Sequence, residues 1–171
     1  MYSTREATMP NLYRLDPAES EFMTSAPYKI KHAIEVHCSA SRMMEALSDN
    51  DQWVQWASPM KKAVWTSERR EKNCTRDVLL IGGVILKEVF FEWDSGTRVS
   101  FFVEKTNIPG LKSFAEEHRI LSLGDDRLRL EFTVAFDMTP KARLLAPVVY
   151  FALKGMVPSM LKNYKTLLER H

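Results

Sequence analysis

The clearest pattern in the chain is an alternation of apolar and polar residues over positions 127–138. A period of two places successive side chains on opposite faces of a β-strand, so this segment predicts a strand with one packed and one solvated face. Its apolar positions are Leu128, Leu130, Phe132, Val134, Phe136 and Met138.

Similar strand-like runs fill most of the chain before this point. A first strand is predicted over 28–37, where Ile30, Ile34 and Val36 alternate with polar residues. From about 61 to 139, further runs are separated by turn signals at 68–72, 82–83, 94–96, 107–110 and 124–126. Consecutive strands joined by short turns predict an antiparallel meander.

Two short helices are predicted between the first strand and this meander. Ser39 or Ser41 can cap the first, Asp49 or Asn50 can begin the second, and Pro59 ends it. Trp53 and Trp56 share one face of the second helix. We expect these tryptophans to anchor the helix on the sheet; the alternative is that they line the mouth of a pocket.

Helical spacing returns over about 141–170, with two apolar stripes. One stripe is predicted to face the sheet; it consists of Leu145, Val148, Ala152, Met156, Ser159, Asn163 and Leu167. The other consists of Tyr150, Val157, Leu161, Tyr164 and Leu168. We expect the N-terminal arm to cover the second stripe; a partner subunit and a membrane surface are the alternatives.

This order of elements predicts an α+β fold of one domain, with a curved antiparallel sheet of six or seven strands around a long C-terminal helix. Residues 1–27 show no period and are expected to form an arm or tail, and residues 28–171 the domain. One helix is too narrow to fill the concave face of such a sheet. We therefore predict an apolar cavity between the sheet and the helix.

Composition narrows the function classes further. The 171 residues carry a net charge of only +2, which gives no field for binding nucleic acid. The longest apolar run, 144–153, is too short to span a bilayer, and residues 1–25 contain no apolar run typical of a signal peptide. We expect a cytoplasmic monomer or homodimer without stable membrane insertion.

No cofactor or metal is expected. The histidines at 32, 37, 118 and 171, together with Cys38 and Cys74, lack metal-ligand spacing, and the chain has no phosphate-binding glycine loop. The two cysteines are predicted to be free thiols.

Four segments resemble the START/Bet v 1-like (SRPBCC) superfamily, in particular its bacterial polyketide cyclase/dehydrase-like branch. They are IEVHCSAS at 34–41 with DQWVQWASP at 51–59, KEVFFEWD at 87–94, the strand at 127–138, and LKNYKTLLE at 161–169. The resemblance covers roughly residues 28–170 and implies a helix-grip fold. It also implies binding of sterols, lipids, polyketides or hormones, and in some members cyclisation or dehydration.

Two residues are candidate catalytic groups. Glu88 faces inward if Val84, Leu86 and Phe90 do, and a buried carboxylate is costly unless it is paired. The alternative is that a bulge at 82–83 turns Glu88 to solvent. His118 is the second candidate, as a general acid or base near neutral pH.

His118 belongs to a run of four ionisable residues, 116–119. Alternation places Glu116 and His118 on one face and Glu117 and Arg119 on the other. Either pair could form a solvated outer face with cross-strand ion pairs.

The leading functional hypothesis is a binder of a hydrophobic small molecule of lipid, polyketide or isoprenoid type. A cyclase, aromatase or dehydratase that uses Glu88 or His118 is the alternative, and an interaction module is a third possibility. The residues predicted to contact the ligand are Trp65, Leu86, Glu88, Phe90, Phe101, Phe132, Val134, Phe136, Ala152, Met156, Ser159, Met160 and Asn163.

Overall fold

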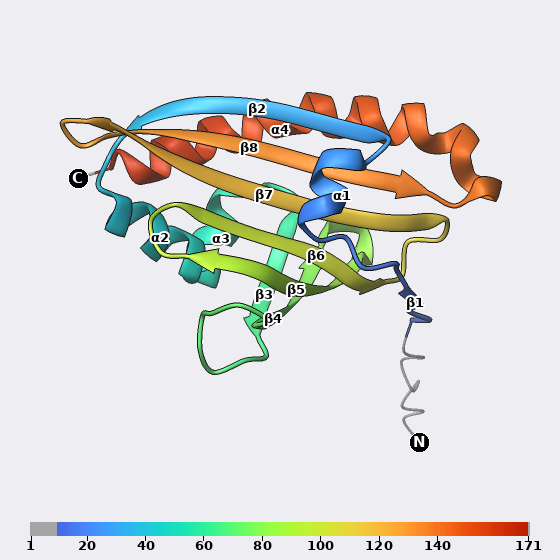
Figure 1. The fold of residues 1–171 in the computed structure, drawn as a ribbon. Helices are drawn as coiled ribbons and strands as arrows, with labels where there is room; N and C mark the ends of the chain where they lie inside the picture. Colours follow the sequence, from blue (N-terminus) through green and yellow to red (C-terminus); the bar gives the residue numbers. More distant parts are fainter. Residues whose placement is uncertain (1–9, 171) are drawn as a thin grey trace, which may run out of the picture.

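The computed structural model describes residues 10–170, so residues 1–9 of the predicted arm and His171 lie outside the described residues. A curved antiparallel sheet lies against the long helix α4, with α2 and α3 at one end (Figure 1). The strands are β1 (Tyr13–Arg14), β2 (Tyr28–His37), β3 (Met60–Trp65), β4 (Thr75–Leu80), β5 (Ile85–Asp94), β6 (Arg98–Thr106), β7 (Leu111–Gly124) and β8 (Arg127–Met138). The helices are α1 (Ser20–Ser25), α2 (Ala40–Ser48), α3 (Asn50–Trp56) and α4 (Ala146–Leu168), with 3₁₀ turns η1 (Ile81–Gly83) and η2 (Pro140–Leu145).

The sheet follows the order β2-β8-β7-β6-β5-β4-β3, and β1 adds an eighth strand beside β6. The α+β helix-grip fold is confirmed. The strands from β3 to β8 are neighbours in the order in which they occur in the chain. β2 pairs with β8 and forms the other edge of the sheet, from Tyr28 opposite Phe136 to His37 opposite Arg127. The additional strand comes from the arm, whose short segment gave no alternation to detect.

The N-terminal arm fills a place where two neighbouring strands separate. β6 and β7 pair only between Arg98 opposite Arg119 and Phe102 opposite Ala115. Beyond this point Tyr13 and Arg14 pair with β6, the Leu15 amide donates to the Glu104 carbonyl, and the Asp16 amide donates to the Lys112 carbonyl. The arm therefore satisfies backbone groups that the separation would leave unpaired.

Local capping explains the two short helices. The Ser39 hydroxyl accepts a hydrogen bond from the Arg42 amide at the start of α2, and the Asp49 carboxylate accepts from two amides at the start of α3. The Trp53 indole N–H donates to the Leu47 carbonyl at 2.8 Å. Trp56 stacks on Tyr164 with ring centroids 4.4 Å apart. These contacts hold α3 against α2 and the C-terminal half of α4 rather than against the sheet alone, and Trp53 also lines the cavity described below.

The predicted sheet-facing stripe of α4 is wrong for five of its seven members: Leu145, Val148, Ala152, Ser159 and Asn163 are exposed. Met156 lines the cavity and Leu167 is buried, as predicted. The buried side is instead formed mainly by the stripe that we expected to face away, with Val157, Leu161, Tyr164 and Leu168 buried. Apolar residues surround the first half of the helix, so periodicity could not select its inner face; the stacking of Tyr164 on Trp56 and packing on the sheet select it.

The predicted cover for the second stripe is also wrong. Ala18 of the arm, with α1, packs on Phe91, Phe102 and Ala115 on the face of the sheet opposite α4 (Figure 1). Alternation along β6 creates this second apolar layer, because Phe101 points inward and Phe102 outward. Within the described residues, the arm therefore covers the outer face of the sheet and not the outer side of α4.

Candidate functional site

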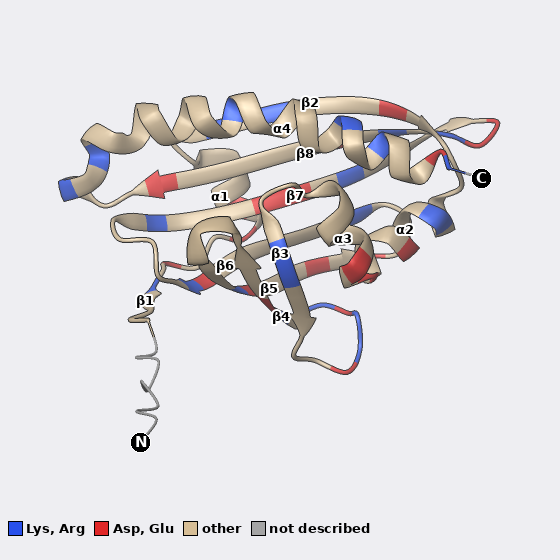
Figure 2. Cartoon of the chain, turned by 180° about the vertical axis from the view of Figure 1, so that it is seen from behind, with Lys and Arg blue, Asp and Glu red and all other residues tan. Residues whose placement is uncertain are grey.

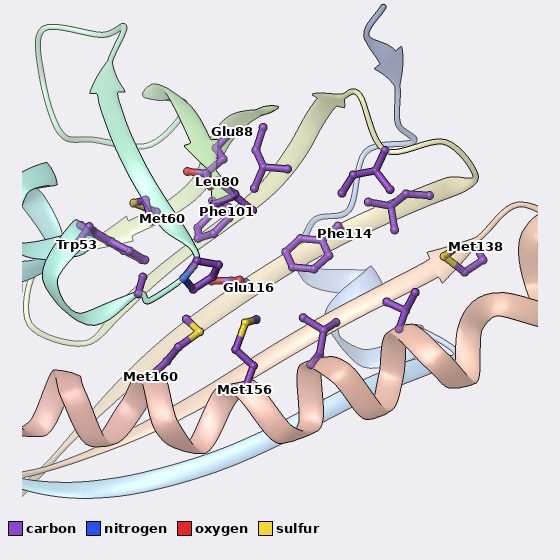
Figure 3. A pocket seen from close by; sticks show the side chains of 17 residues that line it. Trp53, Met60, Leu80, Glu88, Phe101, Phe114, Glu116, Met138, Met156 and Met160 are labelled. Carbon is purple, nitrogen blue, oxygen red and sulfur yellow. The ribbon is translucent and has the colours of Figure 1, made fainter. Parts of the chain in front are cut away.

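A cavity of about 230 Å³ lies between the inner face of the sheet, α3 and α4 (Figure 3). Its walls are apolar except for two carboxyl groups, which belong to Glu88 of β5 and Glu116 of β7. The apolar lining consists of Trp53, Ala57, Pro59, Met60, Leu80, Leu86, Phe101, Ile108, Leu111, Phe114, Met138, Val149, Leu153, Met156 and Met160.

Glu88 reaches the cavity because of the phase of β5. The strand register shifts between Lys87 and Glu88, and Glu88 lies opposite Val103 with its side chain buried. Leu86 and Glu88 both line the cavity. The alternative in which a bulge at 82–83 turns Glu88 to solvent is therefore wrong. β5 alternates regularly from Leu86 to Glu88, and the register shift beside Glu88 places the extra residue, Glu104, on β6.

Arg76 is the partner that makes burial of Glu88 tolerable. It lies opposite Glu88 on β4, fully buried, and its Nε and Nη2 atoms are each 2.7 Å from Glu88 Oε2. The guanidinium carbon is 4.2 Å from the ring centroid of Trp53 and 5.1 Å from those of Trp65 and Phe90. Aromatic faces thus replace part of the hydration that the cation loses.

Glu116 supplies the second carboxyl group of the cavity. It lies on β7 opposite Phe101, and within residues 10–170 no salt bridge engages it. Burial, reinforced by the charge of Glu88 and opposed by that of Arg76, raises the pKa of the Glu116 carboxyl from 4.5 to about 8. At neutral pH this side chain is mostly protonated and can donate a hydrogen bond into the cavity.

The charges of the three groups balance. Burial also raises the pKa of Glu88, but the adjacent Arg76 guanidinium favours its ionised form. With Arg76 positive, Glu88 ionised and Glu116 protonated, the cluster is neutral. A neutral polar cluster in an apolar wall suits an uncharged ligand that carries a hydrogen-bonding group.

The structure places His118 inside the protein but does not bring it to the cavity lining. Its ring makes edge-on contacts with Trp53, Trp56 and Phe132, and within residues 10–170 neither ring nitrogen has a hydrogen-bond partner. Burial, and then the charge of Arg76, lowers the pKa of His118 to about 3. The ring is therefore neutral at physiological pH and lies behind the cavity wall.

Glu116 and His118 form the inward pair of the 116–119 run. Glu117 and Arg119 face outward, where Glu117 lies 3.7 Å from Arg98. The outer pair therefore matches the interpretation of a face with cross-strand ion pairs.

The predicted ligand contacts divide into three groups. Five line the cavity: Leu86, Glu88, Phe101, Met156 and Met160. Five belong to the adjoining core without reaching the lining: Trp65, Phe90, Phe132, Val134 and Phe136. Three are wrong, because they lie on the exposed side of α4: Ala152, Ser159 and Asn163.

Sequence reasoning missed Arg76 and Glu116 as site residues. Arg76 alternates in phase with Val78, and that pattern alone would have placed it on the inner face. Glu116 was assigned to the same face as His118, but the sequence analysis left open whether that face was the inner or the outer one. In both cases a charged residue at an apolar position was the available signal.

Comparison with known proteins agrees with this geometry. A family model described as "Polyketide cyclase / dehydrase and lipid transport" matches residues 27–169. The chain belongs to this family. The resemblance noted in the sequence is thereby confirmed.

Relatives with this fold occur in several bacteria. Uncharacterised proteins of Mycobacterium bovis and Mycobacterium tuberculosis are 27% identical over 154 residues, covering 87% of this chain and 92% of theirs. A START superfamily protein from Mycobacterium smegmatis has a TM-score of 0.69 at 14% identity, covering 83% of this chain and 97% of its own. The Zhui aromatase/cyclase of a Streptomyces species has a TM-score of 0.68 at 16% identity, covering 83% of this chain and 93% of its own. At such identities the two solved structures establish the fold alone.

Proposed function

We propose that this protein binds a hydrophobic small molecule in the cavity between the sheet and α4. The observation that carries the proposal is an apolar cavity whose only polar wall groups, among the described residues, are the carboxyl groups of Glu88 and Glu116. Burial of apolar ligand surface would supply about 25 cal/mol per Å² before ordering costs. The family and the START-like fold support a ligand of this class.

The cavity favours a compact ligand. Its volume of about 230 Å³ is below the range of about 300–1,000 Å³ that is usual for small-molecule sites. Within the lipid, polyketide and isoprenoid types, a molecule of a few rings or a short isoprenoid fits this space better than a long acyl chain. A carbonyl or hydroxyl oxygen on the ligand would accept a hydrogen bond from the protonated Glu116 carboxyl.

Native mass spectrometry of the purified protein, followed by solvent extraction, tests the proposal. We expect a bound hydrophobic compound in the wild type and its loss in Met156→Trp, which fills the cavity from α4. Ser159→Trp is the matched control, because Ser159 lies on the exposed side of the same helix and should leave occupancy unchanged. Equal loss in both variants, or a wild-type protein that takes up no hydrophobic probe, would contradict ligand binding at this site.

A second candidate function is catalysis of cyclase, aromatase or dehydratase type. The observation that favours it is the pair of carboxyl groups in one cavity: burial raises the pKa of Glu116 to about 8, whereas Glu88 is paired with the Arg76 guanidinium. Environments that keep two acids in different protonation states are typical of acid/base pairs. We therefore assign the candidate acid role to Glu116 and the candidate base role to Glu88, in place of His118.

Substitution separates the catalytic candidate from binding alone. Glu116→Gln keeps the shape of the side chain and its ability to donate a hydrogen bond, but it cannot transfer a proton. If the protein is an enzyme, turnover falls by about a hundredfold or more while the ligand still binds. If turnover of an identified substrate survives in both Glu116→Gln and Glu88→Gln, the acid/base assignment is wrong.

A further inference from the structure

The first turns of α4 and the preceding η2 expose a cluster of large apolar side chains. Leu144 is 92% exposed, Val148 68% and Phe151 67%, and Leu145 lies beside them at 57%. Val148 and Phe151 are three positions apart and share one face of α4, and Leu144 and Leu145 end the 3₁₀ turn η2 that leads into it. We name these four residues the docking face.

Positive charge accompanies the docking face. Residues 138–168 contain no Asp or Glu, and their cations are Lys141, Arg143, Lys154, Lys162 and Lys165. Figure 2 shows basic positions along α4 and its approach, with no acidic position among them. Within residues 10–170, no salt bridge engages Lys141, Arg143 or Lys154.

The exposed apolar side chains and the nearby cations together indicate what kind of surface binds the docking face. Exposed apolar side chains flanked by unpaired cations are the features with which a helix lies on an anionic bilayer surface. By length and composition alone, the segment Pro140–Leu168 would be apolar enough to cross a membrane. Its other side packs on the sheet, so the folded protein presents it along a surface.

The docking face is also adjacent to the cavity. Val149 and Leu153 line the cavity from the same helical turns that carry Val148 and Phe151 outward. A bilayer in contact with the docking face would therefore be separated from the cavity by one helix.

We propose that the docking face, with Lys141, Arg143 and Lys154, binds the surface of an anionic lipid bilayer. Docking itself is independent of the proposed ligand function. Only its use for exchanging a hydrophobic ligand with the bilayer rests on that function.

Co-sedimentation of the full chain with lipid vesicles tests the proposal. We expect binding to vesicles of equimolar phosphatidylcholine and phosphatidylglycerol, with weaker binding to phosphatidylcholine alone and at high salt. The double variant Val148→Ser, Phe151→Ser should bind about tenfold more weakly. Leu123→Ser is the matched control, because it removes an exposed apolar side chain from the β7–β8 hairpin at the opposite end of α4 (Figure 1).

The charge contribution has its own control. Lys141→Ala with Arg143→Ala should weaken binding to the anionic vesicles about tenfold and reduce its salt dependence. Arg69→Ala with Lys72→Ala removes two exposed cations from the β3–β4 loop and should change neither property.

Three results would overturn docking. The first is that the wild-type protein does not bind anionic vesicles. The second is that the test and control variants lose vesicle binding equally. The third is that the protein forms a dimer, which Phe151→Ser dissociates, and does not bind vesicles. The last result would assign the face to a second copy of the chain. Met156→Trp should bind vesicles like the wild type, so failure of ligand binding and failure of docking are distinguishable.

Discussion

Two ion pairs lie side by side across β4 and β5 and differ in almost every physical respect. Arg76 pairs with Glu88, and one residue along each strand Asp77 pairs with Lys87. The side chains of the first pair are 0% and 2% exposed, whereas those of the second are 38% for Asp77 and 36% for Lys87. Alternation along the strands sends the first pair into the core beside the cavity and the second pair to the outer face.

The difference shows that the face of the sheet determines what a charge does. On the outer face, water screens the pair and its removal costs little. On the inner face, each charge depends on the other because neither has water to replace it. The inner pair can therefore keep both of its side chains charged next to a bound ligand, whereas the outer pair lies in water away from the cavity.

The largest effect is expected from breaking the inner pair. Arg76→Met leaves the Glu88 carboxylate buried without its cation and should lower the free energy of unfolding by about 3–5 kcal/mol. Urea denaturation at neutral pH measures this. A loss below about 1 kcal/mol would mean that Glu88 is protonated or hydrated without Arg76.

Removing both inner charges should recover much of that loss. In Arg76→Met, Glu88→Met the methionines replace the pair with apolar side chains, and we expect a free energy of unfolding within about 2 kcal/mol of the wild type. A double-mutant cycle of urea denaturations gives the coupling between the two positions. Additive losses would show that the pair acts through packing alone.

A smaller change in the free energy of unfolding is expected from the titration of Glu116. Because the pKa of this carboxyl is about 8 in the folded state and 4.5 in its ordinary state, folding takes up a proton between these values. The stabilisation is complete below about pH 4.5 and is lost as the pH rises through about 8, by at most about 1.4 kcal/mol per pH unit.

The variant Glu116→Gln tests this sign. Its free energy of unfolding should depend less on pH between 5 and 8 than that of the wild type, as measured by urea denaturation at several pH values. Glu117→Gln, one residue away on the outer face, is the control and should keep the wild-type slope. An unchanged slope in Glu116→Gln would mean that the carboxyl is hydrated in the cavity.

The smallest effect is expected on the outer face. Lys87→Met removes the exposed partner of Asp77 and should change the free energy of unfolding by no more than about 1 kcal/mol. Urea denaturation with and without added salt measures it. A loss as large as that of Arg76→Met would remove the distinction between the two faces.

Much of the architecture was readable from local pattern. The alternation over 127–138 predicted β8, turn signals predicted the meander, and Ser39 and Asp49 predicted the helix starts. These features depend on neighbours in the chain, because a strand or a cap is specified by a few consecutive residues.

The candidate site was only partly readable. Glu88 was identified as a candidate, but the sequence alone did not exclude a bulge at 82–83 that would have turned its carboxylate to solvent. Its partner Arg76 lies 12 positions away along the chain and meets it only through strand pairing. Glu116 was assigned to the same face as His118, but its role as a cavity acid emerged only with the shape of the cavity.

The residue pattern was sufficient for the order of the elements from residue 28 onward and for a sheet too wide for one helix to fill, but not for β1 and α1 in the arm. The side of α4 that faces inward, the position of the arm and the set of buried charges depend on three-dimensional packing. The physical reason is that periodicity specifies two faces of an element but not which of them is covered. Contacts between distant segments, such as Trp56 with Tyr164 and Arg76 with Glu88, make that choice.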